Sequence, residues 1–217
     1  MAGTGGHPSV PDNVVDVLNS GTTLNVFLTI AALADGWSVF TGDAQIRRRP
    51  CGPLLDALRG LGAEAASTPG NGCPPCIVRG PLCGGRVAIA CPSSQYLTSL
   101  LLGGPVAQGD TQIEVTLLHE APYVEMTLGW LDAQGIRYER QELRSFRIPG
   151  GQRYRAFRRA IPADFSSATF FLVAAAITGA ELTLVGLDPT DAQGDKAVAQ
   201  MLAAMVMDFS TMLRASR

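Results

Sequence analysis

The sequence predicts an α/β fold built from repeated β-α-β-α-β-β units. Three stretches place Ser or Thr directly before an apolar run, which is the pattern of a helix N-terminus. The steps from Ser20 to Ser93 and from Ser93 to Ser166 are both 73 residues. A helix expected to end at Gly62 is followed 73 residues later by one expected to end at Gly135. Equal spacing of two independent features indicates a duplicated structural unit.

Each unit can be followed along the chain as strands that alternate with helices. After a flexible lead at residues 1–12, we expect one unit over residues 13–85, a second over residues 86–160 and the truncated start of a third over residues 161–217. In the third unit we expect helices at Ser166–Ile177 and Gln193–Met205 around a strand at Glu181–Val185. In the first two units the expected strands are Val14–Leu18, Trp37–Thr41, Glu64–Ser67, Ile77–Arg79, Arg86–Ala90, Gln112–Leu117, Ile136–Glu139 and Ser145–Ile148, and the expected helices are Leu24–Ala34, Pro50–Gly62, Ser93–Leu102 and Pro122–Gln134.

The composition fits a folded α/β protein with mostly buried strands. Of the 217 residues, 47% are hydrophobic and 17% are charged, which excludes an intrinsically disordered class. The net charge is −2, so an anionic partner must be held by local arginines and backbone donors rather than by a long-range field. Lys196 is the single lysine, which leaves almost no material for Schiff-base chemistry.

Neither a signal peptide nor a membrane span is expected. Residues 1–11 are rich in Gly and Pro and lack the basic start and apolar core of a signal peptide. The longest apolar stretches, Leu24–Ala34 and Phe165–Ile177, are shorter than the ~20 residues that a spanning helix needs. We therefore expect a soluble cytoplasmic protein with no membrane partner.

Five cysteines, an odd number without secretory context, indicate reduced thiols. Cys73 and Cys76 have the spacing of a metal or redox pair, and Cys83 and Cys91 are further candidate ligands. However, two prolines separate the pair, no second compact Cys-x-x-Cys follows, and strand-like residues come next where a redox pair would open a helix. We therefore favour free buried thiols over a zinc or redox site.

An arginine-rich segment at residues 137–159 combines eight arginines with four aromatic residues. Such a mixture can bind single-stranded nucleic acid. Because the whole chain is not basic, we favour a solvated hairpin and loop between the second and third units, and expect no nucleic-acid partner. With only His7 and His119, and with no Gly-x-Ser-x-Gly elbow, a serine hydrolase is disfavoured. No complete Walker A or dinucleotide-binding glycine motif is present either.

The polar helix starts are the candidate binding sites. The first N–H groups of a helix have no acceptor within it, so they and nearby hydroxyls can bind a phosphate or carboxylate. Ser93, Ser94 and Gln95 form such a start. Gly21 permits close approach of a ligand to the backbone, and Arg49 can bind a carboxylate or phosphate through two parallel hydrogen bonds. Simple N-capping is the alternative role for the serines at these helix starts.

Seven short motifs resemble, in order and spacing, the 5-enolpyruvylshikimate-3-phosphate synthase family. That family has two globular domains, each of three β-α-β-α-β-β units around a pseudo-threefold axis, with the active site in the cleft between them. The resemblance covers residues 13 to about 205 and implies two of the three units of the N-terminal substrate-binding domain, followed by the start of the return into the other domain. The motifs are Asn19-Ser20-Gly21-Thr22-Thr23, Thr41-Gly42-Asp43, Arg48-Arg49-Pro50, Ser93-Ser94-Gln95, Pro122-Tyr123-Val124-Glu125-Met126-Thr127, Asp164-Phe165-Ser166-Ser167-Ala168 and Gln193-Gly194-Asp195.

The resemblance implies enolpyruvyl transfer from phosphoenolpyruvate to the 5-hydroxyl of shikimate 3-phosphate, a step of aromatic amino-acid biosynthesis that uses no metal or organic cofactor. It places Ser93, Ser94 and Gln95 around the 3-phosphate and Tyr123 beside the shikimate ring. It places Gly21 and Arg49 around phosphoenolpyruvate, and Asn19, from the first motif, belongs to the same expected substrate-binding set.

Two residues depart from the family pattern. The family usually has Arg at the position of Asn25 and Ser at the position of Glu120, and we expect the Glu120 carboxylate to repel the substrate phosphate. The family's N-terminal Lys-Ser-Arg motif has no counterpart in these 217 residues, and its acid and base groups lie in a C-terminal portion that they do not include. We therefore assign no catalytic residue and no metal ligand, and expect the chain to be catalytically incomplete by itself.

Three functions remain open on the sequence. The first is a partial chain of the shikimate-pathway enolpyruvyl transferase. The second is a non-catalytic anion-binding module, or a half-protein that a second chain carrying the C-terminal part completes. The third is the sister enzyme that acts on UDP-N-acetylglucosamine; it carries a cysteine just upstream of its Arg-Pro, whereas Gly42–Ile46 contains none, so we rank it last.

Overall fold

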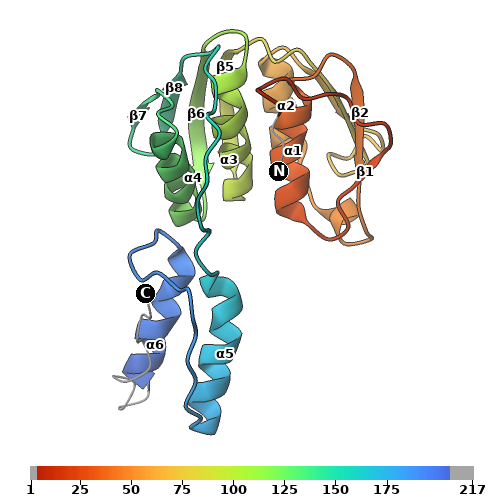
Figure 1. Ribbon diagram of the computed structural model, residues 1–217. Coiled ribbons are helices and arrows are strands. Elements are labelled where there is room, and N and C mark those ends of the chain that lie inside the picture. Colours follow the sequence, from red (N-terminus) through yellow and green to blue (C-terminus); the bar gives the residue numbers. More distant parts are fainter. Residues whose placement is uncertain (1–3, 206–217) are drawn as a thin grey trace. The chain divides into compact units, whose positions relative to one another are not determined.

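The computed structural model describes residues 4–205, which divide into two compact units. Unit 1 extends to Ala156, and unit 2 begins at Phe157. Colours from red to green in Figure 1 mark most of unit 1, and blue marks the helices of unit 2. Within the described part of the chain, no helix combines the length and the apolar character that crossing a membrane requires.

Unit 1 contains two four-stranded mixed sheets with equivalent strand orders. In both sheets the first two strands are parallel and the other neighbours are antiparallel. The identical order and directions confirm the duplicated unit that the 73-residue spacing predicts. The first sheet has the order β1 (Val15–Asp16), β2 (Trp37–Thr41), β4 (Cys76–Arg79), β3 (Glu64–Ser67), and the second has β5 (Gly85–Cys91), β6 (Thr111–Leu118), β8 (Ser145–Ile148), β7 (Glu139–Gln141).

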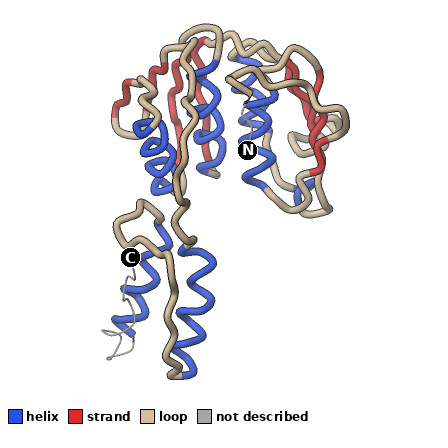
Figure 2. The backbone as a smooth tube through the Cα atoms, viewed as in Figure 1, coloured by secondary structure: helices blue, strands red, loops and turns tan. Residues whose placement is uncertain are grey.

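Two equivalent helices lie side by side in the middle of unit 1, with one sheet on either side of the pair (Figures 1 and 2). These are α1 (Gly21–Ala31) and α3 (Ser94–Gly103), which begin 73 residues apart. The second helix of each unit is α2 (Gly52–Gly60) or α4 (Ala121–Ala133), and short 3₁₀ turns lie at Ile46–Arg48 and Gly104–Val106.

Helix α2 begins later than the sequence predicts. We expected it to open at Pro50, but its first residue is Gly52 and Cys51 is the N-cap. Arg49 precedes a proline, which disfavours helical backbone, and it is extended, with φ −81° and ψ 123°. Arg49 therefore lies outside both the 3₁₀ turn at Ile46–Arg48 and α2.

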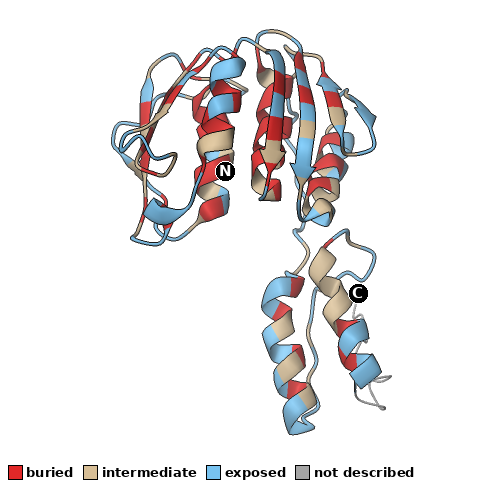
Figure 3. Ribbon diagram, turned by 180° about the vertical axis from the view of Figure 1, so that it is seen from behind, coloured by how far each residue is buried: buried red, intermediate tan, exposed pale blue. Residues whose placement is uncertain are grey.

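The core of unit 1 is one cluster to which both sheets and all four helices contribute. In β5, the buried residues Val87, Ile89 and Cys91 alternate with more exposed ones, as expected for a strand with one covered face. In α3, Leu97 and Leu100 are fully buried. Figure 3 shows this alternation of buried and exposed positions along the helices and strands of unit 1.

Helices α1 and α3 run parallel and touch closely. Ser99 Oγ donates a 2.6 Å hydrogen bond to the carbonyl of Asn25 and shares another with Thr29 Oγ1. One turn earlier, Gln95 Nε2 donates to Thr22 Oγ1 at 2.9 Å. Because the contacts advance in the same direction along both helices, their N-termini lie at the same end of unit 1.

Unit 2 consists of α5 (Phe165–Thr178), a 3₁₀ turn (Gly194–Lys196) and α6 (Ala197–Met205). The predicted strand at Glu181–Val185 is wrong, because a strand needs a hydrogen-bonded partner strand and the described part of unit 2 contains none. Helix α5 begins one residue earlier than predicted, since Asp164 rather than a serine caps it and accepts from the backbone N–H groups of Ser166 and Ser167. Residues 206–217 of the expected third unit lie outside the described residues, so its full extent stays a prediction.

The tight contact between α1 and α3 predicts opposite effects of two Gly→Ala changes. A Cβ at Gly103 would lie 2.3 Å from Thr29 Cγ2, whereas a Cβ at Gly129 in α4 has no neighbour within 4 Å. We expect Gly103→Ala to lower the free energy of unfolding of unit 1 by about 1–3 kcal/mol through overpacking. We expect Gly129→Ala to raise it by about 0.5–1 kcal/mol through helix propensity.

Urea unfolding followed by tryptophan fluorescence measures both effects, because Trp37 and Trp130 both belong to unit 1. Equal stability of the two variants would contradict the close approach of α1 and α3.

Candidate functional site

A cavity of about 540 Å³ lies in unit 1 at the starts of α1, α3 and α4 and extends between α3 and α4. Helix α4 is parallel to α3, since Ser94 contacts Glu120 and Thr98 Oγ1 contacts Thr127 Oγ1 further along. Three helix N-termini therefore converge at one end of the cavity. The lining residues at that end are Thr22, Ser94, Gln95, Glu120 and Tyr123, and those along the two helices are Thr98, Leu102, Met126, Thr127 and Trp130.

The start of α3 holds a carboxylate from within the protein. Ser93 is the N-cap, and its Oγ accepts a 3.4 Å hydrogen bond from the Gln95 N–H. The Ser94 N–H and Oγ–H both donate to Oε2 of Glu120, at 3.3 Å and 3.0 Å. The sequence predicted that Glu120 opposes a phosphate, but it did not indicate that the Glu120 carboxylate accepts these two hydrogen bonds from Ser94.

Gln95 connects the start of α3 to α1. Its Nε2 donates to Thr22 Oγ1, and its Oε1 accepts a 2.8 Å hydrogen bond from Asn25 Nδ2. Asn25 is 7% exposed, and its Oδ1 has no hydrogen-bond partner within the described structure. The amide network therefore fixes the Gln95 side chain and leaves one buried acceptor open.

Arg49 lies directly against the first turn of α1. A Cβ placed on Gly21 would be 2.7 Å from Arg49 Nη1 and 3.5 Å from Gln95 Oε1. The absence of a side chain at Gly21 thus makes room for the guanidinium beside Gln95. Tyr96 of α3 donates a hydrogen bond to the carbonyl of Pro50, which ties the connection that carries Arg49 to the same helix as Ser94.

Asn19 is held by the turn that follows β2. Its Nδ2 donates to Asp43 Oδ2 at 2.7 Å and to Gln45 Oε1 at 3.1 Å. Hydrogen bonds to Asp43, from the backbone N–H of Ile46 above all, lower the pKa of that carboxyl. The structure therefore brings Gly21, Arg49 and Gln95 together, while the Asn19 amide is engaged with this turn.

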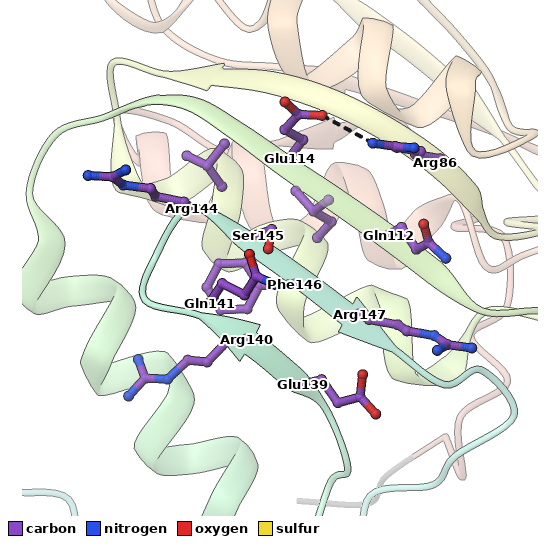
Figure 4. A pocket seen from close by; sticks show the side chains of 12 residues that line it. Arg86, Gln112, Glu114, Glu139, Arg140, Gln141, Arg144, Ser145, Phe146 and Arg147 are labelled. Atoms are coloured by element: carbon purple, nitrogen blue, oxygen red, sulfur yellow. Dashed lines mark hydrogen bonds and ion pairs between the residues drawn. The ribbon is translucent and has the colours of Figure 1, made fainter.

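A second hollow, of about 770 Å³, lies on the face of the second sheet that α4 does not cover (Figure 4). Its arginines extend from β5, from the β7–β8 hairpin and from the turn between those two strands, and they belong largely to the arginine-rich segment of the sequence. Each has an acidic partner, as in a solvated, charge-balanced face, so the preference for a solvated hairpin agrees with the structure. The pairs are Arg86–Glu114 at 3.5 Å, Arg140–Glu125 at 2.7 Å, Arg144–Glu142 at 3.3 Å and Arg147–Asp110 at 3.7 Å.

The five cysteines are free thiols, and three of them are buried. Cys51 Sγ and Cys76 Sγ are 3.3 Å apart, and this contact, together with burial, raises the pKa of Cys51. Burial raises the pKa of Cys91 to about 12. Over residues 4–205, no group of three or more His, Cys, Asp or Glu side chains is arranged to hold a metal ion.

The family model for EPSP synthase (3-phosphoshikimate 1-carboxyvinyltransferase) matches residues 1–213. The chain belongs to the EPSP synthase family. This agrees with the motifs at the starts of α1 and α3 and with the repeated unit that the two sheets display.

Relatives named 3-phosphoshikimate 1-carboxyvinyltransferase align with nearly the whole chain. That of Acetivibrio thermocellus is 56% identical over 205 residues, and that of Ruminiclostridium cellulolyticum is 53% identical over 203 residues; each alignment covers 94% of this chain and 48% of the relative. The structure is also similar to EPSP synthase from Acinetobacter baumannii, with a TM-score of 0.64 and 29% identity over 77% of this chain and 38% of that one. The chain thus spans about half the length of these EPSP synthase relatives.

Thiol reactivity tests the burial of the cysteines. In the native protein we expect Cys83, the exposed thiol, to react rapidly with 5,5′-dithiobis(2-nitrobenzoate), while Cys51, Cys76 and Cys91 react only after unfolding. Burial excludes the reagent, and the raised pKa values of Cys51 and Cys91 keep these thiols protonated and unreactive. Peptide mapping by mass spectrometry identifies the modified residues, with Cys83→Ser as the control that should lose the fast phase. Rapid modification of Cys51 or Cys91 would contradict the packing described.

Proposed function

We propose that these residues form the substrate-binding half of a 3-phosphoshikimate 1-carboxyvinyltransferase. Such an enzyme transfers the enolpyruvyl group of phosphoenolpyruvate to shikimate 3-phosphate, and the proposal needs neither metal nor organic cofactor. One observation carries it: three parallel helix N-termini converge on a cavity, and the donors of Ser94 at that point already bind a carboxylate. Donors that bind one oxyanion have the geometry to bind another.

The 3-phosphate of shikimate 3-phosphate would bind at the start of α3. Hydroxyls of Ser93 and Ser94, the backbone N–H groups of the first turn and the amide of Gln95 are the donors. Tyr123 lines the adjacent cavity, where Thr98 and Thr127 provide hydroxyls beside the apolar side chains of Leu102, Met126 and Trp130. This mixture of polar and apolar groups suits a hydroxylated carbon ring.

Phosphoenolpyruvate would bind beside Gly21 and Arg49. The guanidinium can bind a carboxylate or phosphate through two parallel hydrogen bonds, and the open backbone of Gly21 allows the ligand to come close. Asn19 contributes by holding the turn at Asp43, which leads directly to the segment that carries Arg49.

A non-catalytic anion-binding half that is completed by further polypeptide is the second candidate. Its support is the coverage of about half the length of the relatives, together with the exposed apolar residues of α5. Phe170 and Ile177 are 78% and 79% exposed, although a helix that is apolar on all sides is normally covered in the complete protein. A chain that carries the C-terminal half is the partner that would cover such a surface. The UDP-N-acetylglucosamine alternative is disfavoured, because the family model and the relatives above are named for the shikimate reaction.

Removing both hydroxyls at the start of α3 tests the phosphate site. We expect Ser93→Ala/Ser94→Ala to weaken binding of shikimate 3-phosphate about tenfold or more, because hydrogen bonds to a charged group are lost. Isothermal titration calorimetry on the purified chain measures the affinity. The control is Ser20→Ala, which removes the equivalent cap of α1, where Ser20 Oγ accepts from the Thr23 N–H. Unchanged affinity in the double variant would reduce Ser93 and Ser94 to helix caps.

A polypeptide of these 217 residues alone should form no measurable enolpyruvylshikimate 3-phosphate. The proposed site supplies anion contacts, whereas by family resemblance the acid and base groups lie in the part of the enzyme that this chain does not span. Such groups contribute about 10²–10⁴-fold to the rate. A coupled phosphate-release assay, with a full-length relative as positive control, measures turnover. Substantial activity of the chain alone would show that its own carboxylates, Glu120 and Glu125 first, transfer the protons.

A further inference from the structure

Glu120 occupies the hydrogen-bond donors that the proposed phosphate site requires. Both hydrogen bonds from Ser94, one from its backbone N–H and one from its hydroxyl, end on Oε2 of Glu120. A phosphate group bound at the start of α3 would need these same two donors. We infer that Glu120 is a specificity-determining residue: its carboxylate is an internal competitor, and a phosphate binds only when it displaces that carboxylate. This inference rests on the function proposed above.

The backbone directs Glu120 toward Ser94. Glu120 has φ 61° and ψ 44°, a left-handed conformation that residues other than glycine rarely adopt, and its side chain makes no capping hydrogen bond to its own helix α4. The preceding residue is anchored, because the His119 N–H donates to the carbonyl of Cys91 at 3.0 Å. The corner between β6 and α4 is thereby tied to the corner between β5 and α3, and the carboxylate is aimed at the first turn of α3.

Electrostatics favour the carboxylate in this position. The unpaired N–H groups of a helix N-terminus carry a partial positive charge that attracts an anion. Two anions sharing one hydrogen-bonding position repel each other, so the carboxylate and a phosphate exclude one another there. Glu120 therefore lowers the affinity of the start of α3 for a phosphate.

The consequence concerns the class of ligand that the site selects. A phosphomonoester must expel the Glu120 carboxylate into water, whereas an analogue with a neutral hydroxyl at the same position need not. We expect the chain to discriminate weakly between shikimate 3-phosphate and shikimate, and the discrimination to increase when the carboxylate is removed.

Two variants separate direct occupancy from general charge repulsion. Glu120→Gln removes the charge. Glu120→Asp keeps the charge and also tolerates left-handed backbone, but its side chain is one methylene shorter, so its carboxylate does not reach Ser94. The matched control is Glu125→Gln, which neutralises another carboxylate of α4, one that pairs with Arg140 instead of Ser94.

Isothermal titration calorimetry with shikimate 3-phosphate and with shikimate measures the effect on the purified chain. Glu120→Gln should bind shikimate 3-phosphate about tenfold more tightly than the wild type and bind shikimate about equally. Glu120→Asp should also bind the phosphorylated compound more tightly, and Glu125→Gln should behave as the wild type.

Either of two results overturns the inference. If Glu120→Gln binds no more tightly than the wild type, or if only Glu120→Gln gains while Glu120→Asp does not, the carboxylate does not compete by occupancy. Should Glu120→Gln fail to fold, Glu120→Asp decides alone, because a gain with the charge retained supports occupancy and the absence of a gain overturns it. Failure of the proposed function gives a different result. In that case Ser93→Ala/Ser94→Ala leaves the affinity for shikimate 3-phosphate unchanged, both in the wild-type protein and in the Glu120→Gln variant.

Discussion

The parallel contact between α1 and α3 is the constraint on which the rest of unit 1 depends. Gly103 has no side chain where Thr29 approaches, and Ser99 is hydrogen-bonded to α1, so the two helices are close and fixed in register. Since both helices begin at equivalent positions of a duplicated unit, this register places their N-termini at one end. In this protein of net charge −2, the proposed anion site is thereby built from helix ends and one arginine instead of a basic surface.

Such a position has to be stable when no ligand is bound. The Ser94 N–H at the first turn of α3 has no acceptor within its own helix, and the Glu120 carboxylate supplies one. Glu120 therefore adds stability to the free protein at the expense of affinity for a phosphate, in the manner of other trade-offs between stability and function. The left-handed backbone at Glu120 is consistent with this, because local strain persists where surrounding contacts compensate for it.

Much of this architecture follows from the sequence because its signals are local or periodic. Apolar patterns and turn residues predicted seven of the eight strands of unit 1 close to their observed bounds, and the repeat of polar helix starts predicted that the helices after Ser20 and Ser93 are equivalent. The strand expected at Ile136–Glu139 was misplaced, because β7 (Glu139–Gln141) shares only Glu139 with it. The first helix was expected at Leu24–Ala34, but α1 begins at Gly21, directly after the Ser20 cap. The strand predicted at Glu181–Val185 failed because β-propensity alone supplies no partner strand. The contact between Glu120 and Ser94 was not foreseen, since it joins residues 26 apart and depends on the backbone of one corner. The roles of Ser93, Tyr123 and Arg49 in binding remain predictions, because geometry shows where the donors lie and not which ligand they bind.

The two departures from the family pattern meet at adjacent residues of α3. Glu120 accepts hydrogen bonds from Ser94, and Asn25 donates to Gln95 Oε1 while Gln95 Nε2 donates to Thr22. Both side chains that would reach a ligand are thus engaged within the protein, one by a charge and one by an amide network. Because the two contacts lie on consecutive residues of one helical turn, their effects on affinity are coupled rather than additive. The selectivity of this site is then set by how readily a ligand displaces these internal partners, because each displaced donor or acceptor must find a new partner in the ligand or in water.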